Sequence, residues 1–162
     1  MSHYRFFVNN KISNTEHIEL SDQNIVHQMR SVFRLKEGDK VTVLDNSGFE
    51  YDCEIESMRK DSASLKILQK TQNTNESEKN ITIYSSLIKK NKFELILEKC
   101  TELGVNQFAP IITDHSVRIG FDLDRSKKII KEATEQSLRG KIPNIIDQIN
   151  FSTAIEMATK QQ

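Results

Sequence analysis

The alternation of strand, helix and strand between residues 81 and 113 constrains the fold more than any other feature of the sequence. "ITIYSSLI" is a mostly apolar run of strand length, and "NQFAPIIT" is a second one. Between them, "NKFELILEKCTELG" repeats apolar residues at helical spacing, and Gly104 supplies the left-handed residue that ends a helix. Two strands joined through a helix form a βαβ unit, whose strands are parallel and whose crossover is right-handed. The pattern therefore predicts an α/β domain.

Local signals predict the elements around this unit. Asn91 is expected to cap the first helix, and a second helix is expected from about Asp124 to Arg139, with Leu138 on its core face. "NIIDQI" has the composition of a third strand, and Ser152 is expected to cap a last helix. The α/β domain is thus expected to span residues 81–162.

The first part of the chain has a different pattern. Short alternating runs, "KVTVLD", "EYDCEIES" and "SASLKILQ", are separated by the turn sequences "EGD", "NSG" and "RKD", which is typical of a small antiparallel barrel or sandwich. One or two helical turns are expected in "SDQNIVHQMRSVFR", capped by Ser21 or Asp22. Residues 73–80 are polar and lack a hydrophobic period. We therefore expect a β-barrel domain over residues 1–72 and a linker over residues 73–80.

The composition is typical of soluble globular proteins. Hydrophobic residues make up 36% of the chain, and no run of them is long enough to span a bilayer. The N-terminus "MSHYRFFVNN" lacks the apolar core of a signal peptide, so we expect a cytoplasmic protein with no membrane partner. Cys53 and Cys100 are isolated in the sequence, which favours small buried side chains over a metal site or a disulfide.

Any RNA-binding site must be a local patch, because 23 basic residues balance 23 acidic ones. The concentrated cations of the first domain are Arg5, Arg30 and Arg34, and helical spacing would align the last two with His27, near the "FF" pair. In the second domain, "IKKNK" places Lys90 after the carboxyl end of the first strand, where α/β sheets usually carry their sites. Contact with nucleic-acid phosphates and an ordinary solvated surface both agree with these patterns.

The charges at the end of the first helix also admit two interpretations. Either Lys99 and Glu102 belong to a solvated helix face together with Glu98, or an outside partner stabilises Glu102, which the helix dipole disfavours in the last turn. Motifs such as GxGxxG, HExxH and GxSxG are absent from the sequence. No catalytic residue is therefore identified.

Four longer stretches carry a family resemblance. They are "YRFFV", "HQMRSVFRLKEGDKVTVLDNSGFEYDCEI", "SSLIKKNKFELILEKCTELGVNQFAPIIT" and "EATEQSLRGKIPNI". Their order and spacing along nearly the whole chain resemble the RsmE-type methyltransferases of the SPOUT class, which act on a uridine of bacterial small-subunit ribosomal RNA. The combination of "EKCTELGV" with "EATEQSLR" is its most specific part.

The resemblance implies an α/β fold with an N-terminal β-barrel, namely a PUA-like barrel followed by the first half of a SPOUT (trefoil-knot) methyltransferase domain. It implies a 16S rRNA uridine N3-methyltransferase that uses S-adenosylmethionine, acts in ribosome biogenesis and forms a homodimer. The cofactor site is expected in the C-terminal knot, with no cofactor-binding residue in this segment and no metal.

The resemblance also implies roles for individual residues. Lys99, Glu102 and Gly104 match a family signature and are expected to hold the helix end near the active-site edge. Three further residues match polar positions of the family pattern and join the cations of the barrel. The expected RNA-binding residues are thus Arg5, Arg30, Arg34, Lys90, Gln136 and Arg139.

The sequence ends before the glycine-rich "GPEGG"-like loop and the "LRTETA"-like segment that form the knot and the cofactor pocket in this family. We therefore expect a C-terminally truncated form that does not methylate RNA by itself. The alternative is a non-catalytic, PUA-like rRNA-binding module. A third interpretation is an unrelated PUA-like adapter whose second half mediates assembly.

Overall fold

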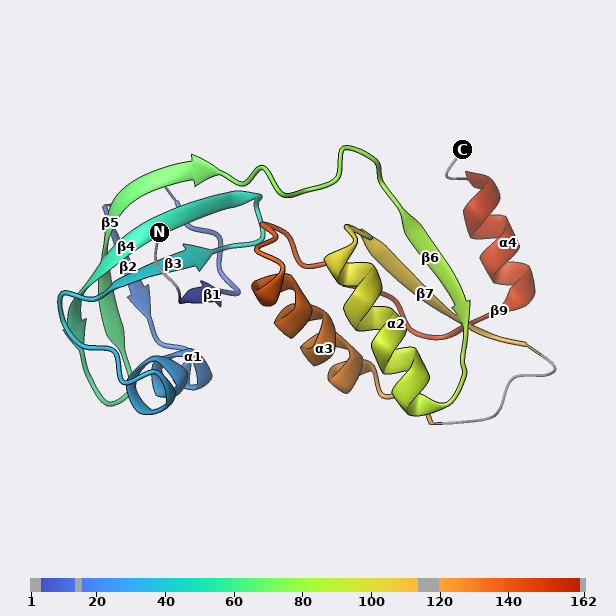
Figure 1. Ribbon diagram of the computed structural model, residues 1–162, viewed down its shortest axis with the longest axis horizontal. Helices are drawn as coiled ribbons and strands as arrows, with labels where there is room; N and C mark the ends of the chain where they lie inside the picture. Colours follow the sequence, from blue (N-terminus) through green and yellow to red (C-terminus); the bar gives the residue numbers. More distant parts are fainter. Residues whose placement is uncertain (1–3, 14–15, 114–119, 161–162) are drawn as a thin grey trace. The chain divides into compact units, whose positions relative to one another are not determined.

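The computed structural model describes residues 4–13, 16–113 and 120–160. The chain divides into two compact units, Met1–Thr74 and Asn75–Gln162, which run from blue to green and from green to red in Figure 1. The boundary between them lies inside the polar interval 73–80. Each unit has its own sheet and its own hydrophobic core.

The first unit is built on a five-stranded sheet in the order β1-β3-β4-β5-β2. Its strands are β1 (Arg5–Phe7), β2 (His17–Leu20), β3 (Lys40–Leu44), β4 (Phe49–Met58) and β5 (Ala63–Gln72). β1 runs parallel to β3, and the other pairs are antiparallel. The sheet is curled (Figure 1), and among the described residues no pairing of β1 with β2 closes it. The expected PUA-like barrel is therefore a curled half-barrel.

Alternation along β4 builds the core of the first unit. Tyr51, Cys53 and Ile55 are buried at every second position of this strand, as a sheet with one covered face requires. They pack with Val41 and Val43 of β3. β3, β4 and β5 are the strands that the sequence pattern predicts. β1, with three residues, is too short to show alternation. The four residues of β2 alternate between exposed and buried, yet this strand is not among the predicted ones.

The helical segment of the first unit begins where the sequence predicts it. Asp22 caps α1 (Gln23–His27) by accepting hydrogen bonds from two backbone N–H groups of the first turn. The chain continues into a π-helical turn, η1 (Gln28–Val32). The wider π turn changes the direction of the side chains that follow, so Met29 is buried while Val32 is 60% exposed.

The second unit contains a parallel sheet covered by helices. Its strands are β6 (Thr82–Ser86), β7 (Gln107–Ile112), β8 (Asn144–Ile145) and β9 (Ile149–Asn150), and its helices are α2 (Lys90–Glu102), α3 (Leu123–Gln136) and α4 (Phe151–Lys160). β7 pairs in parallel with β6 on one side and with β8 and β9 on the other, which confirms the predicted βαβ unit. In Figure 1, α2 and α3 lie side by side on one side of β6 and β7, and α4 lies on the other.

The predicted third strand forms as two short strands, β8 and β9, which pair with β7 before and after its Pro110. β8 pairs with β7 at Gln107 and Phe108, and β9 pairs with it at Ile111 and Ile112. Proline has no N–H group to donate to a neighbouring strand. The interruption between β8 and β9 therefore falls opposite the position where β7 offers no donor.

The end of α2 is as predicted. Gly104 has a φ of 93°, in the left-handed region that favours glycine. Its N–H donates to the carbonyl of Thr101, and the N–H of Val105 donates to the carbonyl of Cys100. This pair of bonds is a Schellman motif, which turns the chain from α2 toward β7.

The second predicted helix ends earlier than expected. α3 stops at Gln136 rather than at Arg139, and Leu138 adopts a left-handed φ of 58° in an equivalent turn. The prediction that Leu138 faces the core is wrong, since 49% of it is exposed. The helical period does not continue beyond the turn, so it no longer describes where this side chain lies.

The predicted N-terminal caps of α2 and α4 are wrong as well. α2 starts one residue before Asn91, and Lys89 at the cap position makes no side-chain capping bond. Asn150, at the end of β9, caps α4 in place of Ser152, because its Oδ1 accepts a hydrogen bond of 2.8 Å from the N–H of Thr153. Both errors displace the helix start by only one or two residues.

The core of the second unit lies between the sheet and the helices α2 and α3. Its buried members are Leu87, Phe93, Leu97, Val105, Phe108, Ile130 and Ile145. On α4 the buried side chain is Ala154. In the part of the chain that the structure describes, none of the helices combines the length and the hydropathy of a bilayer-spanning segment.

Replacing Leu97 with alanine should lower the free energy of unfolding of the second unit by about 2–5 kcal/mol, because a fully buried side chain leaves a cavity. Leu95 on the same helix is 50% exposed. Leu95→Ala is therefore a matched control that should change this free energy by less than about 0.5 kcal/mol. Urea denaturation followed through the amide NMR signals of the second unit measures both. Equal losses from the two substitutions would contradict the burial pattern of α2.

Candidate functional site

The carboxyl edge of the parallel sheet gathers the features of a site. β6 and β7 are followed in the chain by α2 and α3, so both helices begin near this edge. No side chain caps α2, whereas Asp122 caps α3 by accepting the N–H of Arg125. Ser86 and Thr113, at the ends of neighbouring strands, bring their hydroxyl oxygens within 3.5 Å. Lys90 opens α2 as an exposed cation. Helix N-termini, hydroxyls and a cation together suit an anion such as phosphate.

A small cavity lies beside this edge, at the first turns of α2 and α3. Its volume is about 30 Å³, and its walls include Leu87, Phe93 and Phe121. A cavity of this size has room for one or two water molecules. The ion pair of Glu94 and Arg125 borders it. Hydrogen bonds from Arg125 hold the pKa of Glu94 below its usual value of 4.5, so the pair is charged at neutral pH.

Lys99, Glu102 and Gly104 lie at the opposite end of the sheet. They form and follow the last turn of α2, which leads into the amino end of β7. The crossover thus carries the end of α2 away from the carboxyl ends of the strands, and the expected role of these residues near the active-site edge stays a prediction. Lys99 Nζ lies 2.9 Å from Glu102 Oε1 and 2.8 Å from Glu98 Oε1, on an exposed face. Gln136, the last residue of α3, is exposed at the same end.

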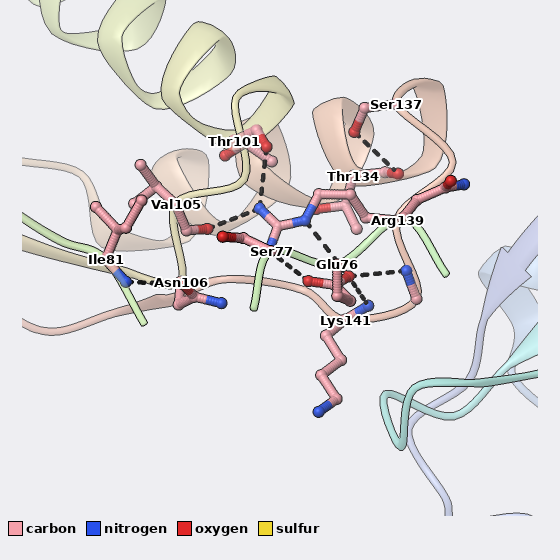
Figure 2. A network of polar contacts seen from close by, with 12 residues as sticks. Glu76, Ser77, Ile81, Thr101, Val105, Asn106, Thr134, Ser137, Arg139 and Lys141 are labelled. Carbon is pink, nitrogen blue, oxygen red and sulfur yellow. Dashed lines mark hydrogen bonds and ion pairs between the residues drawn. The ribbon is translucent and has the colours of Figure 1, made fainter. Parts of the chain in front are cut away.

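Arg139 is buried, in contrast to the RNA-proximal position expected from the sequence. Its side chain is 2% exposed, and its Nη1 donates to the carbonyls of Thr101 and Val105 at 2.9 and 2.7 Å (Figure 2). The guanidinium thus satisfies carbonyl groups at the C-terminal end of α2, where the helix dipole also favours a cation. A side chain enclosed in this way presents no surface to an RNA phosphate.

Glu76 completes this network from the interval expected to be a linker. Its Oε2 lies 2.7 Å from Arg139 Nη2, and its Oε1 accepts hydrogen bonds of 2.9 and 2.8 Å from the N–H groups of Gly140 and Lys141 (Figure 2). Sequence reasoning missed this residue because a single glutamate in a polar run carries no periodic signal.

Arg5 is likewise engaged inside its own unit. Its Nη2 and Nη1 lie 2.7 and 3.2 Å from the two carboxylate oxygens of Glu50, and its side chain is 11% exposed. Burial alone would raise the pKa of Glu50, but hydrogen bonds from Arg5 and Asn73 outweigh burial and hold that pKa below its usual value of 4.5. Arg5 therefore contributes to the sheet of the first unit rather than to an open cationic surface.

Arg30 and Arg34 are exposed cations of the first unit. They do not share one helix face as expected, because η1 ends before Arg34, whose φ of 56° is left-handed. Phe33, between them in the sequence, is 36% exposed and packs on Tyr4 with the ring centroids 4.8 Å apart. The expected aromatic pair, "FF" at 6–7, is buried instead. The segment "RSVFR" was the signal that could have identified Phe33.

Both cysteines are free thiols. Cys53 is buried, which raises the pKa of its thiol to about 12, and burial also raises the pKa of the Cys100 thiol. Neither is a reactive thiolate at neutral pH. Within residues 4–13, 16–113 and 120–160, no three His, Cys, Asp or Glu side chains are placed so that they could hold a metal ion.

Two family models match the chain, and their order follows the two units. Residues 20–68 match the RNA methyltransferase PUA domain, and residues 75–162 match the RNA methyltransferase domain.

Relatives with the same name are found in different bacteria. Ribosomal RNA small subunit methyltransferase E of Bacillus subtilis (strain 168) is 35% identical over 138 residues, which cover 81% of this chain and 54% of the relative. The protein of that name from Synechocystis sp. is 31% identical over 133 residues, which cover 81% of this chain and 43% of the relative. The chain thus spans about half the length of these two relatives.

Solved structures show the same fold. A crystal structure of ribosomal RNA small subunit methyltransferase E from Neisseria gonorrhoeae, bound to S-adenosyl methionine, matches with a TM-score of 0.85 and 29% identity. The match covers 94% of this chain and 64% of that one. A crystal structure of a hypothetical protein matches with a TM-score of 0.87 and 32% identity over 96% of this chain and 66% of that one.

The first unit should lose stability in acid, because folding holds the pKa values of Glu50 and Asp45 below their usual 4.5 and 3.8. This stabilisation is complete above the usual values and disappears as the pH falls through the lower folded ones. Urea midpoints of the first unit, measured from neutral pH downward, should therefore fall in this acidic range. Asp45→Asn should flatten the dependence, whereas Asp61→Asn, in an exposed loop, should leave it unchanged. A dependence that Asp45→Asn does not alter would contradict this assignment.

Proposed function

Because the chain belongs to the RNA methyltransferase domain family, we propose that the protein acts in the transfer of a methyl group from S-adenosylmethionine to N3 of a uridine in small-subunit ribosomal RNA. The observation that carries this proposal is the match of both units, in order, to the PUA and methyltransferase domains of RNA methyltransferases. The names of the Bacillus subtilis and Neisseria gonorrhoeae proteins support the choice of substrate and cofactor. In this proposal the first unit holds RNA, and the second contributes the first half of the catalytic domain.

Two groups of exposed residues carry the proposed RNA contacts. In the first unit, Arg30 and Arg34 flank Phe33 in the sequence, so two phosphate-binding cations accompany an aromatic ring of the kind on which bases stack. In the second unit, Lys90 lies at the carboxyl edge of the sheet, at the N-terminus of α2. These local cations supply the attraction that the balanced overall charge does not.

The residues of the carboxyl edge serve to position the RNA. Holding two reactants in line accounts for several kcal/mol of many enzymatic barriers. Transfer to N3 also requires that the uracil ring lose its N3 proton. A cation such as Lys90 near the ring favours that loss, because it stabilises the anionic form of the base.

The cavity at the carboxyl edge does not accommodate S-adenosylmethionine by itself. The cavity at the carboxyl edge measures about 30 Å³, whereas pockets for ligands of this class measure about 300–1,000 Å³. The two charged groups at its border, Glu94 and Arg125, already pair with each other. When bound, the cofactor supplies the methyl group. We place the residues that bind it in the part of the longer relatives that this chain does not match.

The remaining proposals concern the assembly and the place of the protein. We propose a homodimer, as the resemblance to the RsmE-type enzymes implies, and a cytoplasmic location, where ribosomal RNA is modified. α4 exposes Phe151 at 58% and Ile155 at 53%, so apolar surface is available on the second unit for further contacts.

Replacing both Arg30 and Arg34 with alanine should weaken binding to single-stranded segments of ribosomal RNA and reduce its salt dependence. Each lost phosphate contact lowers the slope of log K against log salt concentration by about 0.7, so the slope should fall by about 1.4. Lys60→Ala combined with Lys66→Ala removes the same charge from exposed positions of the same unit, outside the segment 30–34, and serves as the matched control. Fluorescence anisotropy at several salt concentrations measures both double variants. Equal losses would indicate non-specific attraction and contradict the proposed site.

Calorimetry with S-adenosylmethionine distinguishes the enzyme from a non-catalytic RNA-binding module. We expect no binding by the 162-residue chain, because the cavity at its carboxyl edge is too small, and binding by a form that continues into the remaining segment of the Bacillus subtilis relative. Absence of binding by the extended form would favour the RNA-binding module. Binding by the 162-residue chain itself would contradict the fit argument above.

A further inference from the structure

We propose that two arginine–glutamate pairs, one in each unit, anchor the ends of the connecting segment and leave Thr74 as the hinge between the units. The polar composition of residues 73–80 predicts a linker of that length. The hydrogen bonds of Asn73, Asn75 and Glu76 instead attach these residues to the units on either side.

The first anchor holds Asn73 within the first unit. Asn73 is 9% exposed, and its backbone N–H donates a hydrogen bond of 2.9 Å to the carbonyl of Gly48. Its side-chain amide donates to the carboxylate of Glu50. Glu50 is itself held by the two hydrogen bonds from Arg5. The chain that leaves β5 is therefore fixed through Asn73.

The second anchor begins two residues later, within the second unit. Asn75 Nδ2 donates to the carbonyl of Leu138 at 3.0 Å. Glu76 accepts the backbone N–H groups of Gly140 and Lys141 and pairs with Arg139 (Figure 2). Because that guanidinium also binds the end of α2, this anchor ties the start of the second unit to two of its helix ends.

The two anchors share one design. In each, a glutamate carboxylate that is 17% exposed pairs with an arginine that is 11% or 2% exposed, and accepts further N–H groups. Each arginine is charged. Loss of its glutamate partner would leave an unpaired buried charge, which is costly, and this cost holds the glutamate in place. The two arginines, Arg5 and Arg139, are the expected RNA contacts that the structure places inside the units. Their anchoring role explains why these two cations lie inside the units.

With these anchors in place, the flexible part of the connection between the units is short. Eight flexible residues would allow a root-mean-square span of about 16 Å, whereas one residue between fixed neighbours spans at most a few ångströms. A short connection keeps the effective concentration of one unit near the other high. The benefit of a short connection for RNA that the first unit holds and presents to the second rests on the proposed function. The anchors themselves do not rest on it.

Nitrogen-15 NMR relaxation on the 162-residue chain tests the anchors without RNA or cofactor. In the unmodified chain, the amide order parameters of Asn73, Asn75 and Glu76 should lie near the rigid-backbone value of about 0.85, with a local minimum at Thr74. Glu76→Gln should lower the order parameters of residues 75–79 below about 0.6. Glu78→Gln, an exposed neighbour in the same segment, is the matched control and should leave them unchanged.

A second variant keeps the test decisive if Glu76→Gln unfolds the second unit. Asn73→Ala removes the side-chain bond to Glu50 and leaves the Arg5 pair intact, so the region of low order should extend from Thr74 back into the end of β5 while the second unit is unchanged. Low order across all of residues 73–80 in the unmodified chain would overturn the proposal. So would an Asn73→Ala chain with the unmodified order profile. Neither outcome depends on methylation, so failure of the anchors is distinguishable from failure of the proposed function.

Discussion

The contacts of the Arg139 guanidinium hold the parts of the second unit together. They join three segments that are far apart in the sequence, namely the end of α2, the turn after α3 and the residues around Glu76. A buried arginine costs several kcal/mol unless it is paired and hydrogen-bonded, which makes Glu76 and the carbonyl groups of Thr101 and Val105 necessary partners. Since these carbonyls flank the turn that leads into β7, the same contact fixes how the crossover helix returns to the sheet.

The two ends of the parallel sheet differ in how their charged side chains are engaged. At the amino end, the charged side chains contact other groups of the second unit. Arg139 is buried, and Lys99 pairs with Glu98 and Glu102 on the helix surface. At the carboxyl end, Lys90 in the first turn of α2 and Arg125 in the first turn of α3 are exposed beside a small cavity. The division agrees with the general rule that open α/β sheets place their sites beyond the carboxyl ends of the strands. The proposed methyltransferase function uses that end.

The elements with a clear period could be predicted from the sequence, and those defined by contacts could not. The long strands of the first unit, the βαβ unit and the turn at Gly104 each have a local cause within a few residues. The split between β8 and β9 opposite Pro110 and the left-handed conformation of Leu138 depend on which neighbouring segments the chain contacts. Their local sequence patterns predict a continuous strand and a continuing helix instead. The pair of Glu76 and Arg139 is separated by 63 residues, a distance at which composition and periodicity carry no signal. For the same reason the exposed Arg30, Arg34 and Lys90 could not be told apart in advance from the enclosed Arg5 and Arg139.

Methyl transfer to ribosomal RNA tests the central claim most directly. The chain would be continued into the remaining segment of the Bacillus subtilis relative and incubated with isotopically labelled S-adenosylmethionine and unmodified 16S rRNA, and the nucleosides would be identified by mass spectrometry. The account predicts labelled N3-methyluridine from the continued form and none from the 162-residue chain alone. A continued form that binds the cofactor and leaves the RNA unlabelled, or labels a position other than N3 of uridine, would contradict it.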